Sequence, residues 1–272
     1  MSPLAFTRRG AGAPLVLLHG IGSSRHAWEP VIPALAERFD VLAVDLPGFG
    51  DSEPLPAQVE PHPAALAASV ASWLDGLGIT GPHIAGNSLG GWVALELASR
   101  RPVASLALLS PAGLWRGRTP LYERVSLRIT RWFARHATEL LCHLMRYRLA
   151  RIVAFAQTHG QPSRLSPDYA RTAVRSMGHC PGFEAVMHAA EHQCFVSGSA
   201  IECPVTVVFG SREFLLPHHS RHLDQLPDST RVEELPGCGH VPMADNPNAV
   251  AALIVKATGH ARLTKGSRAA AQ

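Results

Sequence analysis

The chain of 272 residues is poor in charged side chains, which make up 17% of it, and it has no long apolar run. Disordered chains combine much charge with few apolar residues, whereas 46% of this chain is hydrophobic, so we expect a globular protein. No stretch approaches the roughly 20 apolar residues that span a bilayer. This excludes a transmembrane helix, and we expect no stable membrane insertion.

Regular cysteine spacing is also missing. The five cysteines are an odd number, and no C-x-x-C pair occurs, so we expect free thiols rather than a disulfide framework. Residues 1–10 include Arg8 and Arg9, but no signal-like apolar region with a small-residue cleavage site follows them. We therefore expect a cytoplasmic protein.

Acidic residues are scarce in one segment. Between residues 113 and 197, twelve arginines face five acids, a balance of +7, whereas the net charge of the whole chain is +4. This basic segment allows three interpretations: a solvated helix face, a docking surface for acidic lipid or protein, or a guide for anionic substrates. No aromatic-interleaved basic motif accompanies the arginines, so we expect no nucleic-acid partner.

Short apolar runs alternate with segments of helical periodicity along most of the chain. Strands are predicted at residues 14–18, 41–44, 83–85, 103–109, 205–209 and 231–235. Helices are predicted at residues 28–36, 64–77, 89–99, 218–225 and 248–258. Such alternation is typical of a mostly parallel, doubly wound sheet, so we predict an α/β fold.

The alternation stops after residue 112 and resumes at residue 198. We predict a core of residues 1–112 and 198–260, with a helical cap, or lid, inserted at residues 113–197. Residues 261–272 lack periodicity, and we expect a disordered tail there. Within the cap, one apolar stripe at helical spacing consists of Leu121, Val125, Ile129, Trp132 and Phe133.

The pentapeptide Gly86-Asn87-Ser88-Leu89-Gly90 matches the G-x-S-x-G nucleophile elbow and lies between a predicted strand and a predicted helix. At such a turn the flanking glycines remove side chains that would clash, so the serine hydroxyl projects above the sheet. The helix that follows places its positive end, including the Leu89 N–H, near a developing oxyanion. We predict that Ser88 is a catalytic nucleophile.

Two loops supply the expected partners of Ser88. His19-Gly20-Ile21-Gly22 follows the first predicted strand, and we nominate the Ile21 N–H as the second oxyanion donor. The alternative for this loop is a simple tight turn. A serine nucleophile also needs a base, and His240, in a glycine-rich loop after the last predicted strand, is the best placed of the histidines.

The third member of a triad should be a carboxylate between Ser88 and His240 in the chain. Glu213 lies where the strand at 205–209 ends, so we predict that it orients His240. The alternatives are a solvated surface glutamate at this position, with Asp224 or Asp228 as the acid.

Taken together, these motifs resemble the α/β-hydrolase superfamily over approximately residues 14–258. The resemblance rests on HGIG at 19–22, DLPGFGDS at 45–52, GNSLGG at 86–91, GSREFLLP at 210–217 and GCGHVP at 237–242. Glu213 stands where the family usually has aspartate.

This resemblance implies a triad of Ser88, an acid and His240, acyl-transfer chemistry without a cofactor, and a substrate pocket between cap and core. The predicted pocket residues are Gly20, Gly22, Asn87, Leu114, Trp132, Phe214 and Val241.

A metal site is the main competing signal. His188, Glu191 and His192 match the H-x-x-E-H zinc pattern, but no third ligand is indicated, so we favour a cap helix with two incidental histidines and expect no metal.

The favoured function is a carboxylesterase-like serine hydrolase of a small ester, lactone or related carbonyl substrate, as a monomer or homodimer. Three alternatives stay open: a carbon–carbon bond hydrolase of vinylogous diketones, a cofactor-free haloperoxidase or perhydrolase, and a non-catalytic ligand-binding protein on the hydrolase fold.

Overall fold

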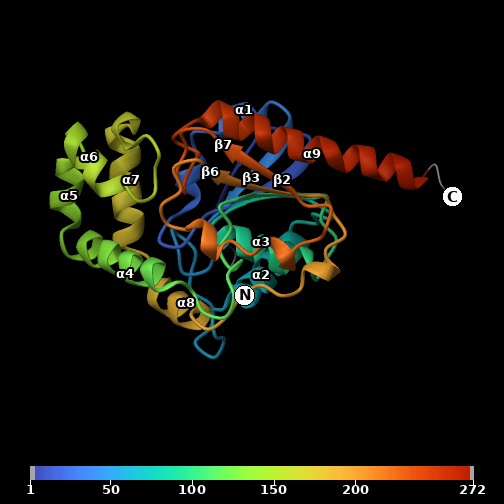
Figure 1. Cartoon of the computed structure of the whole chain (residues 1–272), viewed down its shortest axis with the longest axis horizontal. Coiled ribbons are helices and arrows are strands. Elements are labelled where there is room, and N and C mark those ends of the chain that lie inside the picture. Colours follow the sequence, from blue (N-terminus) through green and yellow to red (C-terminus); the bar gives the residue numbers. More distant parts are fainter. Residues whose placement is uncertain (1–3, 270–272) are drawn as a thin grey trace.

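The computed structural model describes residues 4–269 and is built around a seven-stranded sheet (Figure 1). The strand order is β1-β3-β2-β4-β5-β6-β7, with β1 antiparallel to β3 and every other neighbouring pair parallel. This confirms the predicted doubly wound, mostly parallel α/β fold. The strands are β1 (Phe6–Arg9), β2 (Ala13–Leu18), β3 (Phe39–Val44), β4 (His83–Asn87), β5 (Ser105–Leu109), β6 (Val205–Gly210) and β7 (Arg231–Leu235).

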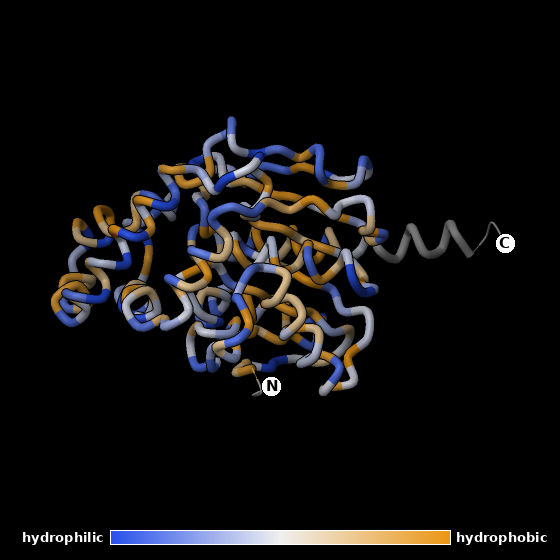
Figure 2. Tube along the Cα trace, turned by 90° about the horizontal axis from the view of Figure 1, so that it is seen from below, coloured by the Kyte–Doolittle hydropathy of each residue, from blue (hydrophilic) through white to orange (hydrophobic). Residues whose placement is uncertain are grey.

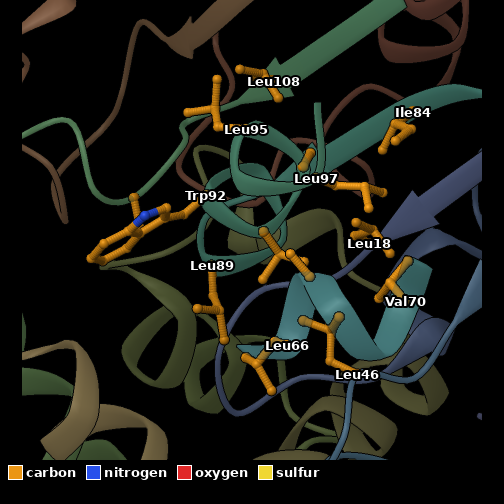
Figure 3. Packing of buried hydrophobic residues seen from close by; sticks show 14 of the residues in the cluster. Leu18, Leu46, Leu66, Val70, Ile84, Leu89, Trp92, Leu95, Leu97 and Leu108 are labelled. Atoms are coloured by element: carbon orange, nitrogen blue, oxygen red, sulfur yellow. The ribbon is translucent and has the colours of Figure 1, made fainter. Parts of the chain in front are cut away.

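Helices cover both faces of this sheet (Figure 1). On one face lie α1 (Ile32–Ala36) and α9 (Pro247–Ala269), and on the other α2 (Pro63–Gly76) and α3 (Leu89–Ala98). Successive strand residues point to opposite faces, so Leu17 packs with the first pair of helices and Leu18 with the second. Figure 3 shows Leu18 among apolar side chains of α2 and α3, including Leu66 and Trp92. The continuous apolar runs are therefore strands buried on both faces.

Two predicted helices differ from the structure. Residues 218–225 form two short 3₁₀ turns, His218–Ser220 and Leu223–Gln225, because histidine and serine are poor helix formers and Pro227 follows closely. The helix predicted at residues 28–36 is reduced to the short α1, which is preceded by a 3₁₀ turn at Arg25–Trp28; Pro30 lies between the two.

Residues 261–269 of the predicted disordered tail are assigned to the end of helix α9, and disorder of the tail stays a prediction. Alanine, arginine, leucine and lysine favour a helix, and extending an existing one avoids the cost of nucleation. The rest of that prediction, residues 270–272, lies outside the described residues.

The segment between β5 and β6 is helical, as predicted. Four of its helices form a lobe beside the sheet, at the left of Figure 1, which we call the cap lobe. It has its own small apolar core around Met145, Phe155 and Val174. The fifth helix, α8 (Phe183–Ala190), packs into the main core instead. The cap lobe comprises α4 (Leu121–His136), α5 (Thr138–Leu144), α6 (Arg148–Phe155) and α7 (Pro167–Gly178).

Within the described residues, none of the helices is both long and apolar enough to cross a membrane.

Candidate active site

Ser88 occupies a strained turn between β4 and α3. Its φ is 52°, a left-handed conformation that non-glycine residues rarely adopt. A Cβ on Gly86 would lie 2.4 Å from the Gly90 carbonyl oxygen, and one on Gly90 would lie 2.2 Å from the Leu18 carbonyl oxygen. Both positions of the motif therefore require glycine, and the tight packing holds the strained serine in place.

His240 and Glu213 form a buried hydrogen-bonded pair. The His240 Nδ1–H donates to Glu213 Oε2 over 2.9 Å, and the exposed fractions of the two side chains are only 3% and 1%. Glu213 Oε1 accepts hydrogen bonds from the backbone N–H groups of Leu215 and Leu216. The pair meets because the two residues follow β6 and β7, which are neighbouring parallel strands whose carboxyl ends share one edge of the sheet.

This pairing opposes the effect of burial on both pKa values. Burial alone would raise the pKa of Glu213, but the charge of His240 and the hydrogen bonds to the carboxylate lower it to about 2. Burial alone would lower the pKa of His240, but the Glu213 carboxylate outweighs it, and the net shift is upward. An ionised Glu213 requires the proton of neutral His240 on Nδ1, which leaves Nε2 as a base.

The other predicted acids lie elsewhere. Asp224 pairs with Arg116 over 3.0 Å at the surface, and Asp228 is exposed.

Backbone N–H groups flank Ser88 on two sides. Leu89 is the first residue of α3, so its N–H has no acceptor within the helix. The loop with Ile21 passes directly over the serine, since a Cβ on Gly20 would lie 3.1 Å from the Cβ of Ser88. Ser88, Ile21 and His240 line the same cavity.

This cavity has a volume of about 700 Å³ and mostly apolar walls. Of the predicted pocket residues, Gly20, Gly22, Asn87 and Val241 line it. Most of the remaining lining comes from the cap lobe, on the side where a pocket between cap and core was expected: Leu127, Phe133, Leu141, Leu144, Val153, Val174 and Met177.

Three predicted pocket residues do not line the cavity. Leu114 is buried in the main core, and Trp132 is 57% exposed on the outward face of α4. Phe214 is also exposed. The N–H groups of Leu215 and Leu216 donate to the Glu213 carboxylate, and this turn directs Leu215 toward the cavity in place of Phe214.

Asn87 has a positioning role that the G-x-S-x-G motif does not indicate, since its second position can be any residue. Its side-chain N–H groups donate to the carbonyl oxygens of Leu109 and His240, over 3.0 and 2.8 Å. The residue before the predicted nucleophile thus holds the loop of the predicted base.

Asp245 was not predicted from the sequence, yet it joins the cap to the His240 loop. Its buried carboxylate accepts backbone hydrogen bonds from Gly160, Gln161 and Gly239, over 2.7 to 2.8 Å. A close approach of Gly160 to Gly239 makes this possible, since a Cβ on Gly239 would lie 2.6 Å from the Gly160 nitrogen. Only the position of Asp245 shortly after a glycine-rich loop could have drawn attention to it.

Glu123 is a second buried carboxyl group near the site, on the inward face of α4. One of its oxygens has no hydrogen-bond partner in the described part of the chain. Burial raises its pKa to about 8, and the charges of His240 and Glu213 act on it in opposite directions. Glu123 is therefore a mostly neutral acid at pH 7.

The glutamate of the H-x-x-E-H pattern makes other contacts in the structure. Glu191 forms ion pairs with Arg124 and Arg128 of α4. Among residues 4–259, whose side chains the structure describes, no group of three or more histidine, cysteine, aspartate or glutamate side chains is placed to hold a metal ion.

A sequence model described as the alpha/beta hydrolase family matches residues 15–253. The chain belongs to the α/β-hydrolase family. Epoxide hydrolase EphH of Mycobacterium tuberculosis is 32% identical over 200 residues, covering 70% of this chain and 92% of that protein. The pimeloyl-[acyl-carrier protein] methyl ester esterase of Neisseria meningitidis is 29% identical over 243 residues, covering 87% of this chain and 74% of the esterase.

Among solved structures, this α/β-hydrolase is similar to a bacterial membrane phospholipase A, with a TM-score of 0.76 and 25% identity. That match covers 95% of this chain and 83% of the phospholipase.

Proposed function

We propose that this α/β-hydrolase is a serine hydrolase that cleaves carboxylic esters or lactones with a largely apolar acyl part. The observation that carries the proposal is the arrangement of Ser88 and the buried His240–Glu213 pair on the wall of one mostly apolar cavity. The proposal extends to Ser88, His240 and Glu213 as a triad and to the Leu89 and Ile21 N–H groups as oxyanion donors.

The reaction follows from these positions. Ser88 Oγ attacks the ester carbonyl carbon while His240 Nε2 takes the hydroxyl proton, and the negative charge moves to the carbonyl oxygen beside the two N–H groups. The carbon–oxygen bond to the alcohol then breaks, and His240 returns its proton to the leaving oxygen. Water, activated by His240, releases the acid from Ser88. In a lactone the leaving alcohol remains attached to the acyl chain.

The two curated relatives support different chemistries, and the nucleophile distinguishes them. If Ser88 opened an epoxide, the product would be an ether of serine, which water does not cleave under mild conditions, whereas an ester of serine is readily hydrolysed. Ser88 therefore supports the ester chemistry named for the methyl ester esterase rather than the activity named for the epoxide hydrolase.

The cavity indicates the kind of acyl group. The cavity volume of about 700 Å³ exceeds what an acetyl group fills. A short acyl chain would therefore leave the apolar walls of the cavity in contact with water. We therefore expect p-nitrophenyl hexanoate to be hydrolysed with a higher kcat/KM than p-nitrophenyl acetate.

Ser88→Ala tests the proposal directly. It should lower kcat/KM for p-nitrophenyl hexanoate by about 10⁵-fold and abolish labelling by a fluorophosphonate, because both need the hydroxyl. Ser69→Ala is the matched control, since Ser69 is equally buried, at 5% exposure, but lies in α2. Wild-type turnover by Ser88→Ala would refute the assignment, and a folded wild-type protein that neither turns over esters nor reacts with the probe would favour a binding protein.

A further inference from the structure

The outward side of the cap lobe is apolar. On α4 and on α6 with the loop before it, large side chains that would be expected inside a protein are a third to three quarters exposed. Exposed apolar patches of this extent are uncommon on soluble monomers. Figure 2 shows apolar stretches along this lobe, at the end of the molecule opposite the C-terminus. The cap outer face consists of Leu121, Val125, Ile129, Trp132, Phe133, Tyr147, Leu149, Ile152 and Val153.

The orientation of α4 is set by contacts on its opposite side. Arg131 is buried, donates to the carbonyl oxygens of Met177 and Gly178, and lies 5.1 Å from the ring centroid of Phe183. Arg124 forms an ion pair with Glu191. Because its polar side is anchored inward, α4 must present its apolar side to the surroundings.

The cavity opens through this face. Ile129, Phe133, Tyr147, Leu149 and Val153 line the cavity and are each about half or more exposed. The same side chains thus form both the cavity mouth and part of the cap outer face.

Cationic side chains flank the apolar residues. Arg135, Arg146 and Arg148 are exposed, and no ion pair joins them to an acid in the described residues. Glu123 and Glu139 are the acids of residues 121–155, which contain seven arginines, and Glu123 is buried. An apolar centre with a cationic border matches the boundary between the headgroups and acyl chains of an anionic lipid layer.

We propose that the cap outer face docks on the surface of an anionic lipid bilayer and presents the cavity mouth to it. A second copy of the chain fits less well. A symmetric dimer through this face would bring like-charged arginines together and close both cavities. The docking does not depend on the chemistry at Ser88.

The chain contains a built-in probe for this docking. Trp132 is 57% exposed, whereas the other four tryptophans are buried. Adding vesicles of equimolar phosphatidylcholine and phosphatidylglycerol should shift the tryptophan emission to shorter wavelength, and Trp132→Phe should remove this shift.

Co-sedimentation with the same vesicles compares Val125→Glu with Val232→Glu. Both valines are about half exposed, at 47% and 54%, but Val232 lies on β7, and neither lines the cavity. Val125→Glu should weaken binding at least tenfold, whereas Val232→Glu and the hydrolysis of a soluble ester by either variant should be unchanged. Replacing Arg135, Arg146 and Arg148 together by glutamine should also weaken binding at least tenfold, since each basic residue contributes roughly fivefold at an anionic surface.

Three outcomes would overturn the proposal. They are absence of binding to the mixed vesicles, equal weakening by the two valine variants, and a dimer in light scattering that Val125→Glu converts to a monomer. The last result would assign the face to a second copy. Loss of vesicle binding with intact ester hydrolysis, or the reverse, separates this proposal from the proposed function.

Discussion

The carboxyl edge of the sheet and the cap lobe distribute polarity in opposite ways. At the sheet edge, polar groups such as Asn87, Glu213 and Asp245 are buried and hydrogen-bonded to backbone groups. In the cap lobe, the buried side includes Glu123 with one oxygen unpartnered, while Trp132 and its apolar neighbours are exposed. Asn87, Glu213 and Asp245 thus bond within the chain itself, whereas the apolar side of the cap surface is exposed to the surroundings.

The two regions meet at Asp245. Its carboxylate accepts hydrogen bonds from the backbone N–H groups of Gly160 and Gln161 in the cap segment and of Gly239, next to His240. The comparison can therefore be tested at three places: in the sheet edge, at the junction and in the cap.

Glu213→Gln, in the sheet edge, should have the largest effect. The amide cannot stabilise a charged His240 and can place a donor against Nδ1, so kcat/KM for p-nitrophenyl hexanoate should fall by about 10³- to 10⁴-fold. The exposed Glu234→Gln is the matched control. Glu213→Asp should recover only part of the loss, because the shorter carboxylate cannot reach both Nδ1 and the N–H groups of Leu215 and Leu216. A rate close to that of the wild type would move the acid to another residue.

The pH dependence of the wild-type rate tests the same pair. His240 must be neutral to accept the proton of Ser88, and its pKa lies above the ordinary 6.5 because Glu213 outweighs burial. The kcat/KM should therefore rise with pH through a midpoint above 6.5. A midpoint below that value would contradict an ionised Glu213 beside His240.

Asp245→Asn, at the junction, should have an intermediate effect. The amide presents N–H groups where three backbone N–H groups already point, so we expect a loss of about 2–4 kcal/mol in the free energy of unfolding and about a tenfold lower kcat/KM. Asp228→Asn, an exposed aspartate, is the control for both measurements. If Asp245→Asn lowered stability but left kcat/KM unchanged, the cap would be shown to act independently of the His240 loop.

Glu123→Gln, in the cap, should change the rate at pH 7 by less than about threefold, but it should change the pH dependence of stability. The unfolded chain loses the Glu123 proton near pH 4.5, while the folded protein keeps it until about pH 8. The folded state therefore binds more protons between these values, and the free energy of unfolding falls as pH rises, by up to about 5 kcal/mol. Urea unfolding of Glu123→Gln should lack this fall, whereas the exposed Glu139→Gln should retain it.

The difference between the sheet edge and the cap lobe also explains which features could be predicted from the sequence. At the sheet edge, a tight turn or a buried strand permits few residue types, so Gly86 and Gly90 are recognisable in the sequence before any contact is known. In the cap, the stripe of α4 is visible as a pattern, but the structure leaves Trp132 exposed and outside the lining of the cavity. A periodic stripe identifies a helix and its apolar face without saying what that face contacts.

The sequence by itself determined the order of strands and helices, the strained turn at Ser88 and the two loops that supply His240 and Glu213. These features depend on local backbone geometry and on the shared edge of parallel strands. Only the tertiary structure decided that Glu213 reaches His240, that Asp245 joins cap to core, and that the apolar side of α4 faces outward. Those outcomes depend on distances between residues far apart in the chain, which local patterns do not encode.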